Sequence, residues 1–490
     1  MPSTAFRTGV TAVALAAAVV SAVVAVPAVA SAAPPVAPTR ADDFNGDGYA
    51  DVAFAAPSAT VNGKAKAGYV AVMYGSATGL KAASKQVFHQ DTAGIPDTAE
   101  AGDTFGGSVT TADLDRDGYA DLVVGAIGED TGTVSNTGSL SVIWGGAKGL
   151  SGGATLVTGE EEYDAVGSLT RVGDFDGDGA TDVVTIAGSH HLRVLSGPFG
   201  RDGSARATAE IRDLNDLRFL DTAAADVNGD GTTDFVAVVN DGDEFDARRI
   251  LYWRGTSQGL APVSTVNGAN GHWIQGGEHL ATGDVNKDGF ADIVVGRAID
   301  GYDSDLDTPL AKGGMVTYVP GGATGPRGAK AKAFNQDTAG VPGAAESSDG
   351  FGSSVSVSDT NGDGYGDIAV GVPGEALGTL KAAGTVTILR GAAGGPTGTK
   401  AQGFNQDTPL IGGAAEAGDR FGGAVKLVDT NADGRSELVV GAPGENAGAG
   451  SVWVLPGTAA GITATGSFTF GAGTLGTVAP GAALGASFNR

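Results

Sequence analysis

Seven copies of an acidic nonapeptide, Asp-x-(Asp/Asn)-x-Asp-Gly-x-x-(Asp/Glu), recur along the chain. Carboxylate, amide and main-chain carbonyl oxygens are the ligands of calcium, which takes six to eight of them at about 2.3–2.6 Å. Oxygen-only ligation favours calcium or magnesium over zinc or copper, and a flexible loop with many ligands favours calcium. The pattern therefore predicts up to seven Ca²⁺ sites. The copies begin at Asp43, Asp113, Asp174, Asp226, Asp284, Asp359 and Asp429.

Each predicted cation loop offers ligands at alternating positions. The side chains at positions one, three and five face a common centre, the seventh residue offers its carbonyl, and the ninth offers an acid that can be bidentate. The glycine at position six permits the positive φ of a sharp turn. The predicted ligands are Asp43, Asn45, Asp47, Tyr49 and Asp51; Asp113, Asp115, Asp117, Tyr119 and Asp121; Asp174, Asp176, Asp178, Ala180 and Asp182; Asp226, Asn228, Asp230, Thr232 and Asp234; Asp284, Asn286, Asp288, Phe290 and Asp292; Asp359, Asn361, Asp363, Tyr365 and Asp367; Asp429, Asn431, Asp433, Arg435 and Glu437.

Two other interpretations of the nonapeptide are weaker. A single Asp-Asn-Gly cluster could be an ordinary surface turn, but seven complete copies are not explained that way. An EF-hand places its last acid at position twelve and leads into a helix, whereas here the last acid is at nine and β-formers follow, as in DLVVGA from Asp121. We therefore favour cations that act as structural staples over cations that act as a functional switch or bridge.

Composition limits the partners of the chain. The 490 residues carry a net charge of −26, and the seven loops alone contain 23 carboxylates. Binding of nucleic acid needs clustered lysine and arginine and is disfavoured. The absence of cysteine excludes disulfides, thiolate metal sites and cysteine nucleophiles. Much of the negative charge of the chain thus belongs to the predicted cation ligands.

The N-terminal residues have the pattern of a secretory signal. Arg7 is followed by an apolar run over 10–26, and Ala30-Ser31-Ala32 is a small-residue cleavage pattern. We expect a signal peptide over 1–32, a flexible linker over 33–41 and a secreted protein with no later membrane span. An uncleaved membrane anchor is the alternative.

The residues around the loops predict short strands. In the second repeat we expect strands over 105–114, 121–128 and 138–145 and near 154–158, because apolar and polar residues alternate in glycine-bounded runs. Four strands per unit and seven units indicate an all-β, seven-bladed β-propeller over 42–490. The first loop lacks a preceding strand, and 484–488 matches 105–109. We therefore expect residues 481–490 to supply the inner strand of blade one and close the ring.

Two further motifs flank the cation loop. A Phe-Gly motif precedes it at Phe105, Phe351 and Phe421, and a Gly-Ala-Pro-Gly-like motif follows it at Gly125, Gly371 and Gly441. This order resembles the FG-GAP repeats of the integrin α-subunit propeller and of secreted bacterial proteins. Blades three and four depart from the pattern. The resemblance covers nearly all of 42–490 and implies a calcium-binding propeller with its loops on one rim, but no single activity.

Few residues indicate catalysis. GTSQG at 255–259 matches the motif of a hydrolase nucleophile, but sister repeats have alanine in place of Ser257, so no catalytic residue is assigned. We expect a monomeric, non-enzymatic adhesion or ligand-binding module that binds an extracellular protein or glycan through the rim opposite the loops. Trp273 could stack on a sugar ring there or anchor a loop. A glycan-active hydrolase or lyase and an inert scaffold are the alternatives.

Overall fold

The computed structural model describes residues 1–2, 41–188, 191–212, 214, 217–241, 244–303 and 306–489. The expected signal peptide (1–32) and nearly all of the expected linker (33–41) lie outside these residues and stay predictions. The chain divides into the units Met1–Pro35 and Val36–Arg490, and all the described strands belong to the second. No helix in its described part has the length and apolarity that a bilayer span requires.

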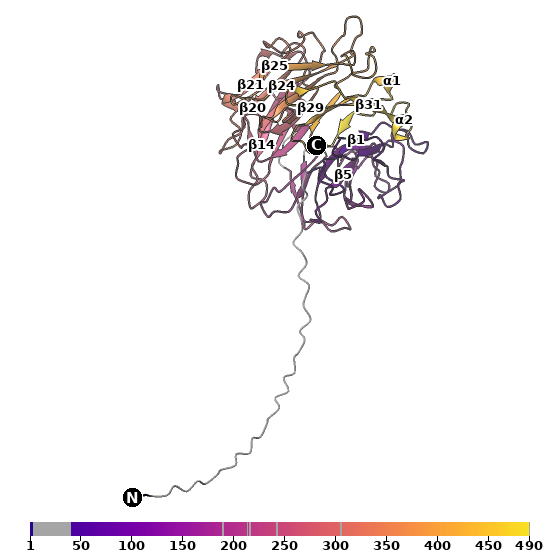
Figure 1. The fold of residues 1–490 in the computed structure, drawn as a ribbon, viewed down its shortest axis with the longest axis vertical. Helices are drawn as coiled ribbons and strands as arrows, with labels where there is room; N and C mark the ends of the chain where they lie inside the picture. The colour runs from indigo at the N-terminus through magenta and orange to yellow at the C-terminus, as the bar shows by residue number, and fades with distance from the viewer. Residues whose placement is uncertain are drawn as a thin grey trace. The chain divides into compact units, whose positions relative to one another are not determined.

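The described strands form seven four-stranded antiparallel sheets (Figure 1). From the inner to the outer edge, these are β32 (Ser487–Phe488), β1 (Val52–Ala56), β2 (Tyr69–Met73) and β3 (Lys85–Phe88) in blade one; β4 (Phe105–Ala112), β5 (Asp121–Ala126), β6 (Ser139–Ile143) and β7 (Gly153–Thr158) in blade two; β8 (Thr170–Gly173), β9 (Asp182–Ala187), β10 (His191–Ser196) and β11 (Ala207–Ile211) in blade three; β12 (Leu217–Ala225), β13 (Asp234–Asp241), β14 (Glu244–Trp253) and β15 (Ser264–Thr265) in blade four.

The remaining blades follow the same order. They are β16 (His279–Gly283), β17 (Asp292–Arg297), β20 (Met315–Val319) and β21 (Lys332–Phe334) in blade five; β22 (Ser354–Ser358), β23 (Asp367–Val372), β24 (Thr385–Arg390) and β25 (Thr397–Phe404) in blade six; β26 (Ala424–Val428), β27 (Glu437–Ala442), β28 (Ser451–Leu455) and β31 (Phe468–Gly471) in blade seven. The short elements are β18 (Tyr302–Asp303), β19 (Thr308–Pro309), β29 (Gly457–Thr458), β30 (Gly461–Ile462), η1 (Gly328–Lys330), α1 (Glu445–Gly448) and α2 (Ala472–Leu475).

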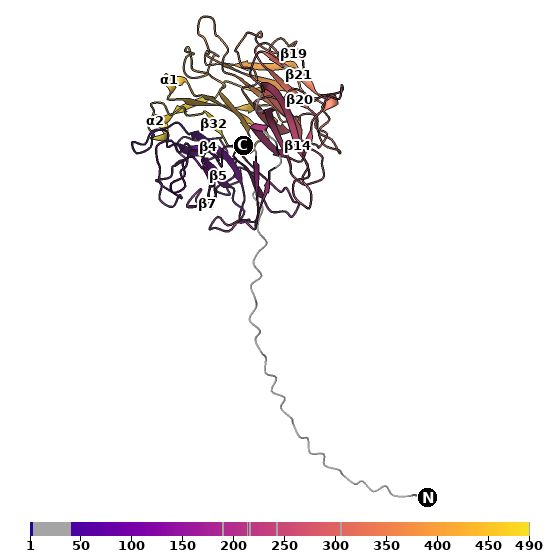
Figure 2. The ribbon, with the colours of Figure 1, turned by 180° about the vertical axis from the view of Figure 1, so that it is seen from behind.

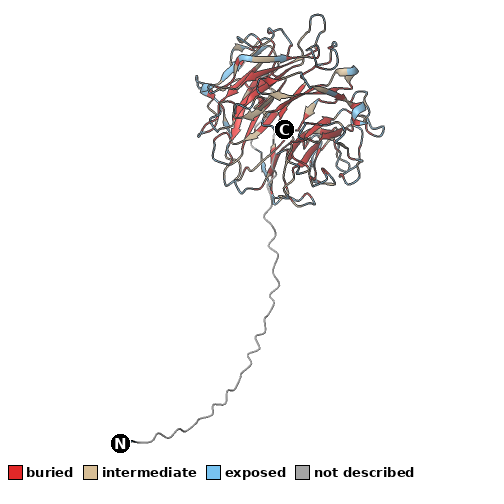
Figure 3. Cartoon of the chain, in the orientation of Figure 1, coloured by how far each residue is buried: buried red, intermediate tan, exposed pale blue. Residues whose placement is uncertain are grey.

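The inner strands form a closed ring. Each contacts the inner strand of the next blade, in the order β4, β8, β12, β16, β22, β26 and β32, while β1 beside β32 contacts β4. The expected seven-bladed, all-β propeller is therefore confirmed. The second strand of the second blade, β5, is buried throughout, whereas the outer strand β11 is mostly exposed. Figure 3 shows this decrease in burial toward the outer strands.

The C-terminal segment closes the ring as expected. β32, which is labelled in Figure 2, pairs with β1 through Phe54–Phe488 and Ala55–Ser487. The main chain of Leu484 bridges to Gly450 in the parallel manner in which Phe421 bridges to Gly384. Leu484 thus occupies the place of the phenylalanine of the Phe-Gly motif.

The recurrent glycines allow adjacent blades to approach closely. A Cβ at Gly125 would collide with the carbonyl of Gly167 in the next blade, and a Cβ at Gly441 with that of Gly485. Blade three keeps this contact although its Phe-Gly pair is replaced, because Val166 bridges to Gly138 where the phenylalanine would lie. In blade four, β12 is irregular, with a shift of register between Phe219 and Asp221.

Candidate metal centres

The cation loops connect the first strand of each blade to the second and lie beside the turns that connect the third strand to the fourth. We call this edge of the propeller the cation-loop rim. The carboxylate at position nine joins the two connections in blade one: Asp51 accepts the N–H of Phe44 in the loop at 2.9 Å and that of Gly75 in the turn at 2.8 Å. The same pair of bonds recurs at Asp121, Asp182, Asp234, Asp292 and Asp367.

Position nine is therefore a structural acceptor as well as a predicted ligand. In blades one, two and three each oxygen of this carboxylate accepts one amide bond, which leaves a lone pair for a cation. In blade six, Oδ2 of Asp367 also accepts bonds from the hydroxyl of Thr360 and from Nη1 of Arg390. Burial raises the pKa of Asp51 and of Asp121 to about 8 and that of Asp182 and of Asp292 to about 6. A neighbouring dication would favour the ionised form of each.

The loops themselves are held open around a centre by main-chain amides. In all seven, the carboxylate at position one accepts the N–H of the glycine at position six, at 2.6–3.0 Å. The carboxylate at position five accepts the N–H of position seven, at 2.8–3.2 Å. Gly118 has a φ of 92°, as the turn requires.

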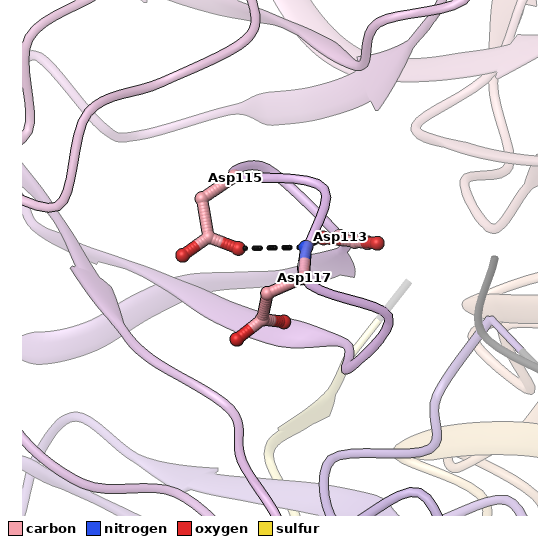
Figure 4. Close-up of side chains that lie close together, drawn as sticks. All are labelled: Asp113, Asp115 and Asp117. Carbon is pink, nitrogen blue, oxygen red and sulfur yellow. Dashed lines mark hydrogen bonds between the residues drawn. The ribbon is translucent and has the colours of Figure 1, made fainter. Parts of the chain in front are cut away.

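Two loops bring three acids into a chelating arrangement. One oxygen from each of Asp113, Asp115 and Asp117 lies within 4.8 Å of the others (Figure 4). Positions one, three and nine of loop three, which are Asp174, Asp176 and Asp182, do the same. In the other five loops position three is asparagine, so the corresponding oxygen belongs to an amide. An all-oxygen donor set with several carboxylates fits a hard cation such as Ca²⁺, and the residues at the predicted ligand positions fit this group.

Main-chain hydrogen bonds connect consecutive loops to one another. The carbonyl of position one accepts the N–H of position eight in the next loop, as from Ala120 to Asp43 at 2.9 Å and from Ser436 to Asp359 at 2.8 Å. The same bond links loops three and four, four and five, and five and six. A cation that orders one loop would therefore also hold the contact between two blades.

The opposite rim carries a repeated contact that the sequence analysis missed. A glutamine in the connector after the fourth strand donates its amide to a glutamate in the next blade's loop between its second and third strands: Gln90 to Glu129, Gln336 to Glu375 at 2.5 Å, and Gln406 to Glu445 at 2.6 Å. The signal was present as the repeated Gln-Asp-Thr, followed by a glutamate after each Gly-Ala-Pro-Gly-like motif. Burial raises the pKa of Glu129 to about 8.

Replacing Glu129 with glutamine is expected to stabilise the protein at mildly alkaline pH and to change little at acid pH. The carboxyl group of Glu129 has an ordinary pKa of 4.5, and burial raises this pKa to about 8 in the folded protein. The unfolded chain therefore loses the carboxyl proton at a lower pH than the folded protein does. The contribution of Glu129 to stability is thus full below pH 4.5 and is lost as the pH rises toward 8. Thermal melts of Glu129→Gln across this range check the prediction. The exposed Glu160→Gln is the control, and equal pH profiles for the two variants would contradict it.

A hollow lies between blades four and five, where the connector that carries Trp273 faces η1 and β21. It has a volume of about 640 Å³ and is lined by Trp273, His272, Leu306, Met315 and Lys332, among others. Trp273 is half-buried, and the guanidinium of Arg249 lies 5.1 Å from its ring centre. The other three tryptophans, Trp144, Trp253 and Trp453, are buried, as expected of packing residues.

Comparison with known proteins identifies the repeats. The FG-GAP repeat family matches residues 39–73, 105–143, 351–389 and 421–455, and the FG-GAP-like repeat family matches 174–237 and 226–295. The two irregular blades, three and four, thus match the FG-GAP-like repeat family.

Curated relatives match parts of the chain at low identity. Phosphatidylinositol-glycan-specific phospholipase D of Rattus norvegicus is 28% identical over 200 residues, which cover 39% of this chain and 22% of the relative. Integrin alpha pat-2 of Caenorhabditis briggsae is 30% identical over 238 residues, 46% of this chain and 18% of the relative. Integrin alpha-V of Gallus gallus is 37% identical over 89 residues, 18% of this chain and 8% of the relative. The chain spans only 8–22% of the length of these relatives. With its repeats matched and its ring closed, the chain is an FG-GAP repeat protein with an integrin-like β-propeller.

Proposed function

We propose that this protein is a secreted, calcium-binding β-propeller that binds an extracellular protein or glycan without catalysing a reaction. Calcium ions in the seven loops act as structural staples on the cation-loop rim. The ligand contacts the opposite rim, where longer connectors leave the surface free to vary. The secretory pattern over 1–32 supports the extracellular location.

The hollow around Trp273 is the observation that carries the binding proposal. Its volume of about 640 Å³ falls within the range of small-molecule sites, about 300–1,000 Å³. An indole ring offers a flat apolar face for a sugar ring or an apolar side chain. Asn270, His272 and Gln275 place polar groups around the ring, which suits a ligand with several hydroxyl or amide groups.

The activities of the full-length relatives cannot be assigned to this chain. The match to phosphatidylinositol-glycan-specific phospholipase D covers only 22% of that protein, and the matches to the integrins cover still less. What they support is a repeat unit that longer proteins also use.

Binding can be tested on a glycan array and on a panel of extracellular matrix proteins at millimolar calcium. Because the other three tryptophans are buried, a change of tryptophan fluorescence on binding reports chiefly on Trp273. We expect Trp273→Ala to lose binding and Trp273→Phe, which keeps an aromatic face, to retain part of it. Release of product from a bound glycan would instead identify a hydrolase or lyase, and no ligand on either panel would leave an inert scaffold.

A further inference from the structure

Loops two and three differ in charge from the other five. Their third position is an aspartate, Asp115 and Asp176, where the others carry asparagine. In four of those five loops the asparagine amide donates to a carboxylate of the same loop: Asn45 to Asp47 at 3.1 Å, Asn228 to Asp234 at 3.4 Å, Asn286 to Asp292 at 3.4 Å and Asn431 to Glu437 at 2.8 Å. An ionised aspartate has no N–H to donate. Loops two and three therefore gather one more negative charge and lack this internal donor.

An arginine supplies the missing donor in loop two. Nε and Nη2 of Arg201 contact Oδ2 of Asp115 and Oδ2 of Asp117. Both aspartates use their other oxygen, Oδ1, to accept loop amides. The guanidinium also lies 5.1 Å from the ring centre of Trp144, a cation–π contact that orients it toward the loop.

A second arginine does the same in loop three. Nη2 of Arg206 donates to Oδ2 of Asp176 at 2.7 Å, and Nη1 contacts Oδ2 of Asp178. Here too the Oδ1 atoms accept loop amides. Each guanidinium thus bridges the third and fifth positions of a loop, which are two of the predicted calcium ligands.

Both arginines come from one irregular segment. The turns between the third and fourth strands follow a recurrent Gly-x-x-x-Gly pattern in six blades, and blade three replaces it with the sequence GPFGRDGSAR over 197–206. The N–H of Phe199 in this segment donates to the carbonyl of Leu114 in loop two at 2.9 Å, which places Arg201 beside that loop. The segment that lacks the recurrent turn therefore supplies the arginines that contact the two loops with aspartate at position three.

In the part of the chain that the structure describes, the other arginines at the loops contact one loop carboxylate each, and Arg390 contacts Asp367, at position nine of loop six, at 2.8 Å. Single contacts to the carboxylate at position five are made in loops four, five and seven by Arg254 to Asp230 at 3.4 Å, Arg327 to Asp288 at 2.7 Å and Arg435 to Asp433 at 3.4 Å. In these loops the third position is a neutral asparagine.

We propose that Arg201 and Arg206 serve as internal cations of loops two and three, where they compete with calcium for the carboxylates at positions three and five. This inference rests on the proposed calcium binding. A guanidinium and a Ca²⁺ ion draw on the same carboxylates, and two cations at one loop repel each other. The carboxylates at positions three and five of loops two and three then keep a cationic partner when calcium is scarce.

The test compares calcium titrations of the wild-type protein, the double variant Arg201→Gln/Arg206→Gln and the control Arg212→Gln. Arg212 pairs with Glu210 in the same blade and contacts no cation loop in the described structure. We expect isothermal titration of the double variant to show two sites whose calcium affinity is about tenfold higher than in the wild type, because a unit charge about 6 Å from a dication contributes about one decade even at the dielectric of bulk water. The control should match the wild type.

Thermal melts give an independent measurement. In EGTA the double variant should melt below the wild type, because two loops have lost their internal cation, and calcium should close that gap. Unchanged or weaker calcium affinity in the double variant would overturn the inference while leaving calcium binding intact. A wild-type protein that binds no calcium at any loop would overturn the proposed function as well.

Discussion

Removing calcium with EGTA is expected to lower the melting temperature by a large margin, and Ca²⁺ is expected to restore it. The seven loops place 23 carboxylates on one rim, and without cations their repulsion opposes folding. A site with a Kd of about 0.1 mM in about 1 mM calcium contributes about 1.4 kcal/mol to the free energy of unfolding. Seven such sites approach the whole stability of a typical domain, about 5–15 kcal/mol. The hydrogen bonds between consecutive loops extend the effect of each ion to the contact between blades.

Two controls separate calcium stapling from a general effect of ions. Mg²⁺ should restore less of the melting temperature than Ca²⁺ at equal concentration, because it demands a smaller octahedral site and retains its water. Asp363→Asn removes a predicted ligand carboxylate from loop six, so it should reduce the rise in melting temperature that calcium produces. The exposed Glu162→Gln should not. A melting curve that is the same in calcium and in EGTA would contradict the prediction.

The regular parts of this fold could be predicted because each blade repeats the same local signals. Strand β5 was expected over 121–128 and is observed over Asp121–Ala126, because apolar β-formers follow the last acid of the loop and a glycine follows them. The ring closure could be predicted from the match of 484–488 to the start of β4, since the chain ends were the one place where an inner strand was missing.

The contacts between blades could not be read from the repeats. Arg201 lies 84 residues after Asp117 and reaches it only because the turn of blade three lies against the loop of blade two. Likewise, the second role of Asp51, as acceptor of a turn amide from Gly75, depends on where the next hairpin folds back. The hairpin of β18 and β19 in blade five is also longer than the single antiparallel bridges Val61–Lys64, Thr131–Val134 and Leu377–Leu380 of the corresponding loops.

Deleting residues 481–490 is expected to open the ring and to destabilise the protein even in saturating calcium. β32 supplies the inner strand of blade one, and Asn489 adds two bonds to Ala53, its N–H donating to the carbonyl at 3.2 Å and its side-chain oxygen accepting the N–H at 3.1 Å. Leu484 is fully buried and Phe488 is 5% exposed, with its ring 5.8 Å from that of Phe54. Phe488→Ala alone should cost about 3–5 kcal/mol, as for other buried phenylalanines. Thermal melts of both variants in calcium measure the effect.

A permuted chain tests whether the loss comes from ring closure. In blade two the inner strand runs without a break into Asp113, and aligning Phe488 with Val109 places residue 490 directly before Asp42. Moving residues 481–490 to that position gives blade one all four strands from one continuous segment. We expect this chain to recover most of the melting temperature that the deletion loses, because the strand then pairs with β1 without a contact between the chain ends. If the deletion melts like the wild type, the terminal strand contributes nothing to closure. If neither the deletion nor the permuted chain is stable, the connector from blade seven, rather than the strand, holds the ring.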